Sequence, residues 1–331
     1  METVAVMQYT KAIEELYLTS NFYLMKLSIV TTLYRSRPFL ERFISEMEDV
    51  VASLSINDYE MVFVNDGSPD ASLDYLIGAK NEHPKIRIVD LSRNFGHHYA
   101  LQAGLTFACG DYIYMVDNDL ETPSSFLKEC YESMMDDNSL DIVYGVQSKR
   151  KGHLIEKQGG ATFWSLFNRL SDIKIPANIL TECLMTRKFV NELLRLNDAN
   201  LFLGGMIHWV GLNKKEIPVE KGLRDGKSTY TFSKRVALMI QALTTFSGKP
   251  LEFLFYTGML ITIFSVVFII YLVVKKLIMG DAISIGWTSL VAINLLSLGL
   301  ISTFLGLIGL YLFRIYRQVQ GRPNYIIKKI Y

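Results

Sequence analysis

The N-terminal part of the chain alternates apolar runs with polar segments. Four runs are rich in β-branched and aromatic residues and are bounded by turn-forming residues, which predicts strands. They lie at 27–33, in the segment 59–70, at 86–91 and in the segment 112–119. Helix-like segments at 38–54 and 72–82 separate the first three runs. This strand–helix alternation predicts a parallel sheet with right-handed crossovers, and therefore an α/β fold.

Polar side chains stand where three of these runs end. Thr31 is near the end of the first run, Asp66 follows the second, and Asp117 and Asp119 follow the last. In an open α/β sheet the carboxyl ends of the strands form the ligand-binding edge. Carboxylates there are suitable ligands for a hard divalent cation that carries a diphosphate. An isolated Asp-x-Asp would equally indicate a strand running out into a polar turn, and the second strand of the same kind favours a site.

Two long apolar stretches near the C-terminus predict transmembrane helices. Residues 253–274 contain no charged residue over 22 positions, and residues 285–313 contain none over 29. About 20 apolar residues suffice for a helix to cross a bilayer. At these lengths, buried helices of a large soluble domain are the weaker alternative.

The cations that flank these stretches predict orientation. Those outside the pair are Lys234, Arg235, Lys249, Arg314, Arg317, Arg322, Lys328 and Lys329, whereas the connecting loop carries Lys275 and Lys276. Because cationic flanks face the cytosol, we expect a multi-pass membrane protein with both termini cytosolic and a small hairpin tip outside.

A division into five regions follows. We expect an N-terminal extension at 1–24, a catalytic domain at 25–230, a juxtamembrane amphipathic helix at 231–250, a transmembrane hairpin at 251–313 and a cytosolic basic tail at 314–331. The segment FSKRVALMIQALTTF has apolar residues at helical spacing, which is typical of an interfacial helix. A surface helix packed on the catalytic domain is the alternative.

Composition narrows the function class. Hydrophobic residues make up 50% of the 331 residues, and this excess is concentrated near the C-terminus. The net charge of +1 suggests no nucleic-acid partner. Cys109, Cys130 and Cys183 show neither metal-ligand nor disulfide spacing, as expected for thiols in a reducing cytosol.

Four motifs, taken in order, resemble those of a known family. LSIVTTLYRSRPFL, VFVNDGSPDAS, LSRNFGHHYALQAGL and YIYMVDNDLETP are similar to motifs of family 2 glycosyltransferases with a GT-A nucleotide-sugar domain. Together with GKSTY and the two apolar spans, they resemble polyprenyl-phosphate glycosyltransferases, the bacterial relatives of dolichol-phosphate mannose synthase. The resemblance implies a UDP-sugar donor, an undecaprenyl phosphate acceptor in a lipid bilayer, and Mg²⁺ or Mn²⁺. It also makes a homo-oligomer a reasonable expectation.

The resemblance assigns roles at the donor side. Asp117 and Asp119 become metal ligands, Glu121 the third metal-side residue, Asp66 a contact to uracil or ribose, and Thr31 a neighbour of the base. The alternative for Asp66 is an Asx-type turn residue that caps a helix beginning near Ser68; both roles are compatible.

The loop LSRNFGHH supplies further donors. Arg93 can grip a phosphate with its planar fork. His97 and His98 are expected as donors at a helix N-terminus near the diphosphate or sugar. A structural role for at least one of the two histidines fits equally well.

The acceptor side calls for cations, because a lipid phosphate is already an anionic nucleophile. Arg150, Arg224 and Lys227 are the main candidates, with Lys149 and Lys151 as further ones. Ser228 belongs to the GKSTY segment, which by resemblance helps to hold the acceptor phosphate. For any single lysine, a solvated surface position is the alternative. The catalytic set is thus Asp119, Glu121, Arg150, Arg224 and Lys227.

The segment ILTECLMTRK departs from the resembled pattern. Glu182 is a candidate base or metal-facing residue, provided that the strand register brings it to the site. If Cys183 replaces an arginine that relatives carry, one phosphate or sugar contact is lost.

These features predict inverting transfer of a sugar from a UDP-sugar to undecaprenyl phosphate, supplying a lipid-linked sugar for surface polysaccharide such as O-antigen. One alternative is direct transfer to a glycan or glycolipid, although the QxxRW signature of processive synthases is absent from the chain. Nucleotidyl transfer would call for a glycine-rich loop after the first strand, and TTLYRSRP contains no glycine. A non-catalytic membrane scaffold is the remaining alternative.

Overall fold

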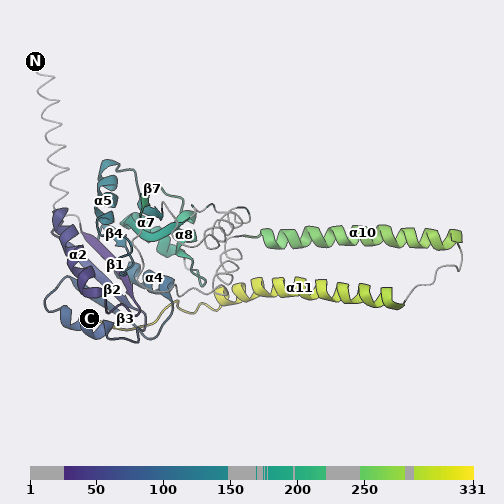
Figure 1. Cartoon of the computed structure of the whole chain (residues 1–331), viewed down its shortest axis with the longest axis horizontal. Coiled ribbons are helices and arrows are strands. Elements are labelled where there is room, and N and C mark those ends of the chain that lie inside the picture. Colours follow the sequence, from purple (N-terminus) through teal and green to yellow (C-terminus); the bar gives the residue numbers. More distant parts are fainter. Residues whose placement is uncertain are drawn as a thin grey trace, which may run out of the picture. The chain divides into compact units, whose positions relative to one another are not determined.

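Among the residues that the structure describes, one sheet of eight strands organises the larger unit of the computed structural model (Figure 1). In spatial order its strands are β7 (Lys214–Val219), β5 (Ile142–Gln147), β6 (Ile179–Thr186), β4 (Tyr112–Met115), β1 (Leu27–Leu33), β2 (Tyr59–Asn65), β3 (Ile86–Leu91) and β8 (Ile327–Ile330). The structure describes residues 26–147, 178–196, 198–220, 247–279 and 287–331, with the single positions 169, 174 and 176. The predicted extension at 1–24 and residues 231–246 of the predicted juxtamembrane helix lie outside these ranges.

The centre of the sheet is parallel, as the sequence predicts. β1 pairs in parallel with β2 and with β4, and β2 pairs in parallel with β3. The register sets Thr32 opposite Val64 and Val30 opposite Met115, so β1, β2 and β4 end at the same edge. We call this the carboxyl edge. The α/β class and the convergence of these three strand ends are confirmed.

Helices cover the sheet because each carries a stripe of apolar residues. α2 (Leu40–Ser53) buries Leu40, Phe43, Ile44, Met47 and Val51, which follow the i, i+3, i+4 spacing of one helix face. With α3 (Ser72–Ala79) and α5 (Phe126–Asp136), α2 contributes to a core that includes alternate residues of β1. Burying each large apolar side chain contributes roughly 1.5–3 kcal/mol.

The intervening residues of β1 meet a different helix, α4 (His97–Phe107). Gly104 of α4 lies so close to the sheet that an added Cβ would collide with Val30 and Val64. The missing side chain therefore lets α4 pack closely on β1 and β2. α7 (Arg187–Arg195) packs on α4, and α8 (Leu203–Trp209) follows it in the chain.

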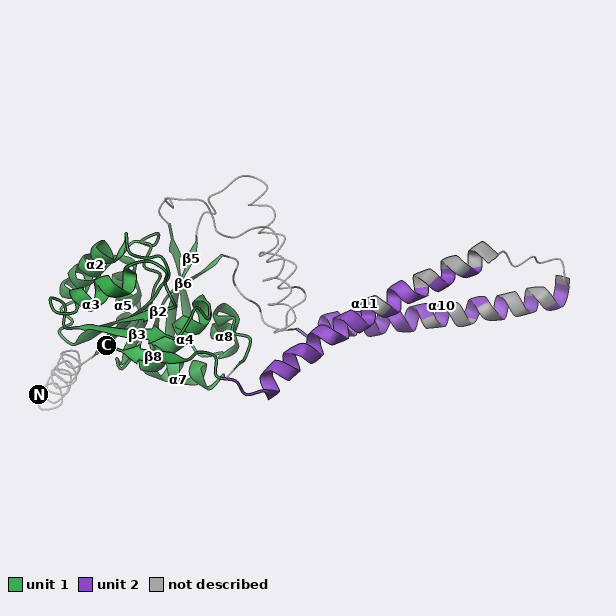
Figure 2. Ribbon diagram, turned by 90° about the horizontal axis from the view of Figure 1, so that it is seen from below, with its two compact units in different colours: residues 1–164, 175–229, 323–331 green, residues 165–174, 230–322 purple. Residues whose placement is uncertain are grey.

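Two long apolar helices form a second unit, which Figure 2 colours separately. α10 (Lys249–Met279) and α11 (Trp287–Val319) have 31 and 33 residues and run side by side. Their large apolar side chains face outward; Phe253 is 73% exposed and Leu277 81%. Within the described residues, Ser297–Val319 is the stretch that is long and apolar enough to cross a membrane.

The C-terminal region differs from the predicted basic tail. α11 continues to Val319, and Ile327–Ile330 then pairs antiparallel with β3 as strand β8. Ile88 and Tyr331 exchange two backbone hydrogen bonds of 3.2 and 2.9 Å. Residues 323–331 therefore belong to the unit that contains the sheet. The lysines of this segment suggested a solvated tail. In the structure, Lys328 and Lys329 lie between Ile327 and Ile330 in an edge strand.

Candidate functional site

The acidic turn, which we define as Asp117–Thr122, follows β4 at the carboxyl edge. Asn118 is buried, and its amide donates a 2.7 Å hydrogen bond to the carbonyl of Thr32 on β1. Asp119 accepts the N–H of Glu121 through Oδ1 at 3.2 Å. The predicted carboxylates thus sit on a turn that is fastened to the neighbouring strand. Asn118 and Thr32 were not among the predicted site residues; a polar residue between two aspartates was the signal for the first.

His97 connects the acidic turn to β1. Its Nε2 lies 3.5 Å from Oδ1 of Asp117, and its Nδ1 lies 3.1 Å from Oγ1 of Thr32. Both Asp117 and His97 remain accessible, with 28% and 40% of their side chains exposed. As the first residue of α4, His97 also stands at the positive end of a helix dipole. A negatively charged ligand at this point would meet both the helix terminus and an imidazole.

Asp66 holds the loop that leads into α4. It is buried, and its two carboxylate oxygens accept the backbone N–H groups of Phe95 and Gly96 at 2.7 and 3.0 Å. Its carbonyl accepts the amide of Asn94 at 3.0 Å. Burial raises the pKa of Asp66, and the two N–H donors act in the opposite direction. Asp66 therefore fixes the loop RNFGHH against the end of β2.

The helix-capping alternative for Asp66 is wrong. α3 begins at Ser72, and the carboxylate that accepts the N–H of Ser72, at 3.2 Å, belongs to Asp70. The Asx-type bond in this turn comes from Asn65, which accepts the N–H of Ser68 at 3.1 Å. The predicted contact of Asp66 to uracil or ribose stays a prediction.

Gly67 allows the same loop to approach β2 closely. Its φ is +60°, and a Cβ at this position would lie 2.6 Å from the backbone nitrogen of Asn94. Any side chain would clash with the loop backbone and would also strain the left-handed conformation. The turn NDGS thus supplies both the carboxylate that holds the loop and the space that admits it.

Thr31 and Arg93 are the other residues predicted to contact the sugar donor. Thr31 is buried, whereas Arg93 is exposed. Thr31 is only 1% exposed within β1, whereas its neighbour Thr32 contacts His97. Arg93 is exposed, its guanidinium lies 4.2 Å from the ring centre of Phe95, and it donates to the carbonyl of Asn94 at 3.1 Å. Arg93 can therefore reach a phosphate from the loop that Asp66 fixes. The roles predicted for Thr31 and Arg93 stay predictions.

His98 has the structural environment that the sequence left open for one of the two histidines. Its ring packs edge-on against Phe202 at 6.1 Å. Burial lowers the pKa of His98 to about 4, and the neighbouring His97 adds to this effect. His98 is therefore neutral at physiological pH, whereas His97 faces the acidic turn.

Glu182 and Cys183 lie inside the protein. Glu182 on β6 is 0% exposed, and its Oε1 accepts the hydroxyl of Thr122 at 2.7 Å. Cys183 is buried between β4 and β5, and burial raises the pKa of its thiol. The structure therefore adds Thr122 to the residues around the site. A glutamate within the apolar run ILTECLMT was the sequence signal for this pair.

The donor chemistry at the acidic turn fits a divalent cation, with a difference from the predicted three-carboxylate set. Within the described ranges, no three His, Cys, Asp or Glu side chains converge closely enough to hold a metal. Asp117 is turned toward His97, and Asp119 accepts a backbone N–H of its own turn. Mg²⁺ commonly takes one or two carboxylates and completes its shell with substrate phosphates and water. Asp117 and Asp119 suit that arrangement, and ligation by Glu121 stays a prediction.

The predicted acceptor residues lie outside the described ranges. These are Arg150, Arg224, Lys227 and Ser228, with Lys149 and Lys151. The part of the chain that the structure describes contains a cavity of about 390 Å³ at the opposite edge of the sheet, lined by Lys26, Glu60, Arg87 and Tyr331 among others. None of the predicted site residues lines that cavity.

Comparisons with known proteins cover most of the chain. The family model described as Glycosyl transferase family 2 matches residues 28–194. YkcC of Bacillus subtilis (strain 168), an uncharacterized glycosyltransferase, is 35% identical over 92% of this chain and 94% of its own length. A bactoprenol glucosyl transferase of Shigella phage SfII is 30% identical over 92% of this chain and 98% of its own. Glucosyl-3-phosphoglycerate synthase from Mycobacterium tuberculosis, solved with Mn²⁺, UDP-glucose and phosphoglyceric acid, overlaps 67% of this chain and 78% of its own at a TM-score of 0.48 and 16% identity.

Proposed function

We infer that this chain, which belongs to glycosyl transferase family 2, transfers a sugar from a UDP-sugar to a polyprenyl phosphate. The observation that carries this proposal is the carboxyl edge, where the acidic turn, His97 and the loop held by Asp66 come from adjacent strands. The family match spans all of these elements. A relative named as a bactoprenol glucosyl transferase supports a polyprenyl phosphate acceptor.

On the donor side, the negative charge that develops on the leaving diphosphate is what the site has to stabilise. A Mg²⁺ or Mn²⁺ ion held by Asp117 and Asp119 would supply Lewis-acid stabilisation of that charge. The chain itself contributes Arg93, the N-terminus of α4 and His97 as groups that favour an anion. Asp66 keeps these groups in place by binding two backbone N–H groups of their loop.

On the acceptor side, a phosphate monoester needs no strong base, because it already carries negative charge at neutral pH. One of its oxygens forms a bond to the anomeric carbon while the bond from that carbon to the UDP oxygen breaks. The electron pair leaves with UDP, and a single displacement inverts the configuration at the anomeric carbon. Arg150, Arg224 and Lys227 are proposed to balance the acceptor charge, and Ser228 to help hold it.

The apolar helices α10 and α11 provide a reason for a lipid acceptor. Each helix is longer than the roughly 20 residues that cross a bilayer. Both helices expose many large apolar side chains, and such a surface is unfavourable in water. We propose that both span the membrane as a hairpin. The lysines and arginines outside the pair support a catalytic domain on the cytosolic side.

The decisive test is sugar transfer by the purified full chain in detergent. The enzyme is incubated with Mn²⁺ or Mg²⁺, undecaprenyl phosphate and a panel of labelled UDP-sugars, and extracted lipids are analysed by mass spectrometry. We expect an acid-labile sugar–phosphate–lipid from at least one donor. No such lipid from any donor, or transfer only to an added glycan, would contradict the proposal.

A further inference from the structure

The acidic turn is fastened at both of its ends. Asn118 donates to the carbonyl of Thr32 on β1 at 2.7 Å, and Thr122 donates to Glu182 on β6 at 2.7 Å. Between these points, Leu120 adopts a φ of +55°, a left-handed conformation that a non-glycine residue does not favour. Such a conformation persists where the surroundings fix it. These two side-chain hydrogen bonds flank Leu120 on either side, and Asp119 also accepts the N–H of Glu121 across it at 3.2 Å.

The second of these fastenings uses a buried carboxylate. Glu182 has no exposed surface, and it lies in β6 beside the apolar residues that fill the sheet. Taking a carboxylate out of water is costly unless hydrogen bonds compensate it. The hydroxyl of Thr122 is one such donor, and it belongs to the residue directly after Glu121. A group at this depth cannot touch a sugar or a phosphate in solvent, but it can fix the turn that does.

We propose that Glu182 is a positioning residue, which sets the acidic turn through the hydroxyl of Thr122 and thereby sets the affinity of Asp117 and Asp119 for a divalent cation. This inference rests on the cation site of the proposed function. It assigns Glu182 neither of the two roles that its sequence suggested, a base or a metal-facing residue. Hydrogen bonds to the groups around a metal site commonly change metal affinity by 10- to 100-fold.

Substitutions at 182 and 122 distinguish a positioning role of Glu182 from a role as a base or as a metal ligand. A glutamine at 182 keeps an oxygen that can accept the hydroxyl of Thr122, but it removes the negative charge. A methionine at 182 removes both, and Thr122→Val removes the donor while keeping the shape. Positioning through this hydrogen bond therefore predicts that Glu182→Gln is mild, whereas Glu182→Met and Thr122→Val both weaken cation binding.

The experiment measures Mn²⁺ binding to the full chain in detergent by electron paramagnetic resonance, with UDP present, together with the melting temperature. We expect Thr122→Val and Glu182→Met each to weaken Mn²⁺ binding at least about tenfold. The double variant should bind Mn²⁺ no more weakly than Glu182→Met alone, because that variant already removes the bond to Thr122. Glu182→Gln should bind within about threefold of the unaltered chain, which is the rescue that a positioning role predicts.

A matched control separates positioning from general destabilisation. Glu60 is another buried glutamate that accepts a hydroxyl at 2.7 Å, from Ser28, at the opposite edge of the sheet. Glu60→Gln should lower the melting temperature without changing Mn²⁺ affinity. Equal loss of Mn²⁺ affinity in Glu60→Gln and Thr122→Val would overturn the inference.

Three further outcomes would overturn it. Unchanged Mn²⁺ affinity in Thr122→Val would do so even if Glu182→Met failed to fold. A Glu182→Gln variant as weak as Glu182→Met would show that the charge itself is used, as for a ligand or a base. Sugar transfer without saturable Mn²⁺ or Mg²⁺ binding would remove the cation site but leave the transferase. Conversely, intact Mn²⁺ effects without any lipid-linked product would reject the proposed acceptor and leave this inference standing.

Discussion

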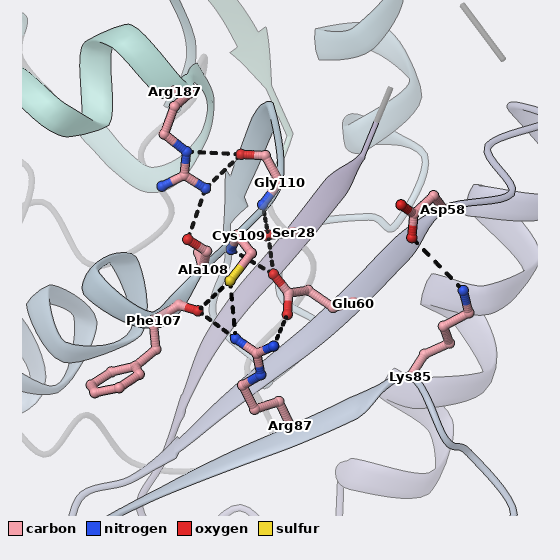
Figure 3. A network of polar contacts seen from close by, with 10 residues as sticks. All are labelled: Ser28, Asp58, Glu60, Lys85, Arg87, Phe107, Ala108, Cys109, Gly110 and Arg187. Atoms are coloured by element: carbon pink, nitrogen blue, oxygen red, sulfur yellow. Dashed lines mark hydrogen bonds and ion pairs between the residues drawn. The ribbon is translucent and has the colours of Figure 1, made fainter. Parts of the chain in front are cut away.

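A buried acid at one edge of the sheet differs from the acids of the acidic turn at the other edge. At the amino edge, which we define as the edge where β1, β2 and β4 begin, Glu60 accepts the hydroxyl of Ser28 at 2.7 Å and the N–H of Cys109 at 2.6 Å (Figure 3). Glu60 also lies 3.3 Å from Arg87. At the carboxyl edge, Asp117 and His97 meet at 3.5 Å and both remain accessible. Donors saturate Glu60 at one edge, whereas at the other the turn is fixed and the carboxylate of Asp117 stays accessible.

Two arginines at the amino edge bind backbone carbonyls of the connection between α4 and β4. The guanidinium of Arg187 donates to the carbonyls of Gly110 and Ala108, and that of Arg87 donates to the carbonyl of Phe107 at 2.7 Å (Figure 3). These bonds fix the connection between α4 and β4. The acidic turn follows β4, and these bonds hold the backbone shortly before the first residue of β4.

The largest expected effect comes from the acidic turn itself. Asp119→Asn removes a charged oxygen ligand while retaining an oxygen that can accept the N–H of Glu121. We expect sugar transfer to fall at least about 10²-fold, on the scale of losing one electrostatic stabiliser. The melting temperature should stay unchanged, since Asp119 is not part of the core. Product formation per folded protein is the measurement, and retained activity would exclude a role for this carboxylate.

A smaller loss is expected when the loop of α4 is released. Asp66→Asn replaces one oxygen with an amide donor, which cannot accept the N–H of Phe95 or Gly96. Transfer should fall about tenfold, since a displaced loop misplaces its donors, and the KM for the UDP-sugar should rise. Initial rates over a range of donor concentrations measure both parameters. Unaltered kinetics would show that the loop keeps its place without this carboxylate.

At the amino edge, replacing a buried carboxylate should lower the stability of the fold and leave sugar transfer unchanged. Glu60→Leu leaves the Ser28 hydroxyl and the Cys109 N–H without their acceptor and removes the carboxylate that pairs with Arg87. We expect a loss of about 2–3 kcal/mol of stability, with unchanged activity per folded molecule. Thermal unfolding of the full chain in detergent measures the first quantity. A selective fall in kcat would mean that the two edges are not separate in function.

The smallest expected effect concerns pH. The pKa of His98 falls from its ordinary 6.5 to about 4 in the folded chain, chiefly because of burial. Between these values the unfolded chain binds a proton that the folded chain does not, so stability falls as pH drops from about 6.5 toward 4. The contribution is about 1–2 kcal/mol between pH 7.5 and pH 5. The melting temperature of His98→Gln should depend less on pH over this window; an equal dependence would contradict the assignment.

The sequence predicted the elements that are defined by local apolar patterns. The runs at 27–33 and 86–91 correspond to β1 and β3 at the same bounds, and the predicted helices overlap α2 and α3. Parallel alternation then brought Asp66 and the Asp-x-Asp pair to one edge, as the register confirms. A local pattern therefore sufficed for the central strands and for the place of the site.

What could not be predicted depends on residues far apart in the chain. Asp66 binds a loop 29 residues later, and Thr122 donates to Glu182, which is 60 residues away. β8 joins the sheet beside β3, although well over 200 residues separate them. Apolar periodicity does not predict such partners, because these residues come together only through the order of the strands in the sheet.

The position of β8 in the chain determines when the sheet can be completed. The strand is synthesised after α10 and α11, yet it pairs with β3 near the beginning of the fold. During translation, β3 therefore keeps an open edge until both apolar helices have left the ribosome. A chain interrupted after Val319 would retain every residue of the acidic turn but present that unpaired edge to other chains. Completion of the sheet therefore has to wait until both α10 and α11 have been synthesised.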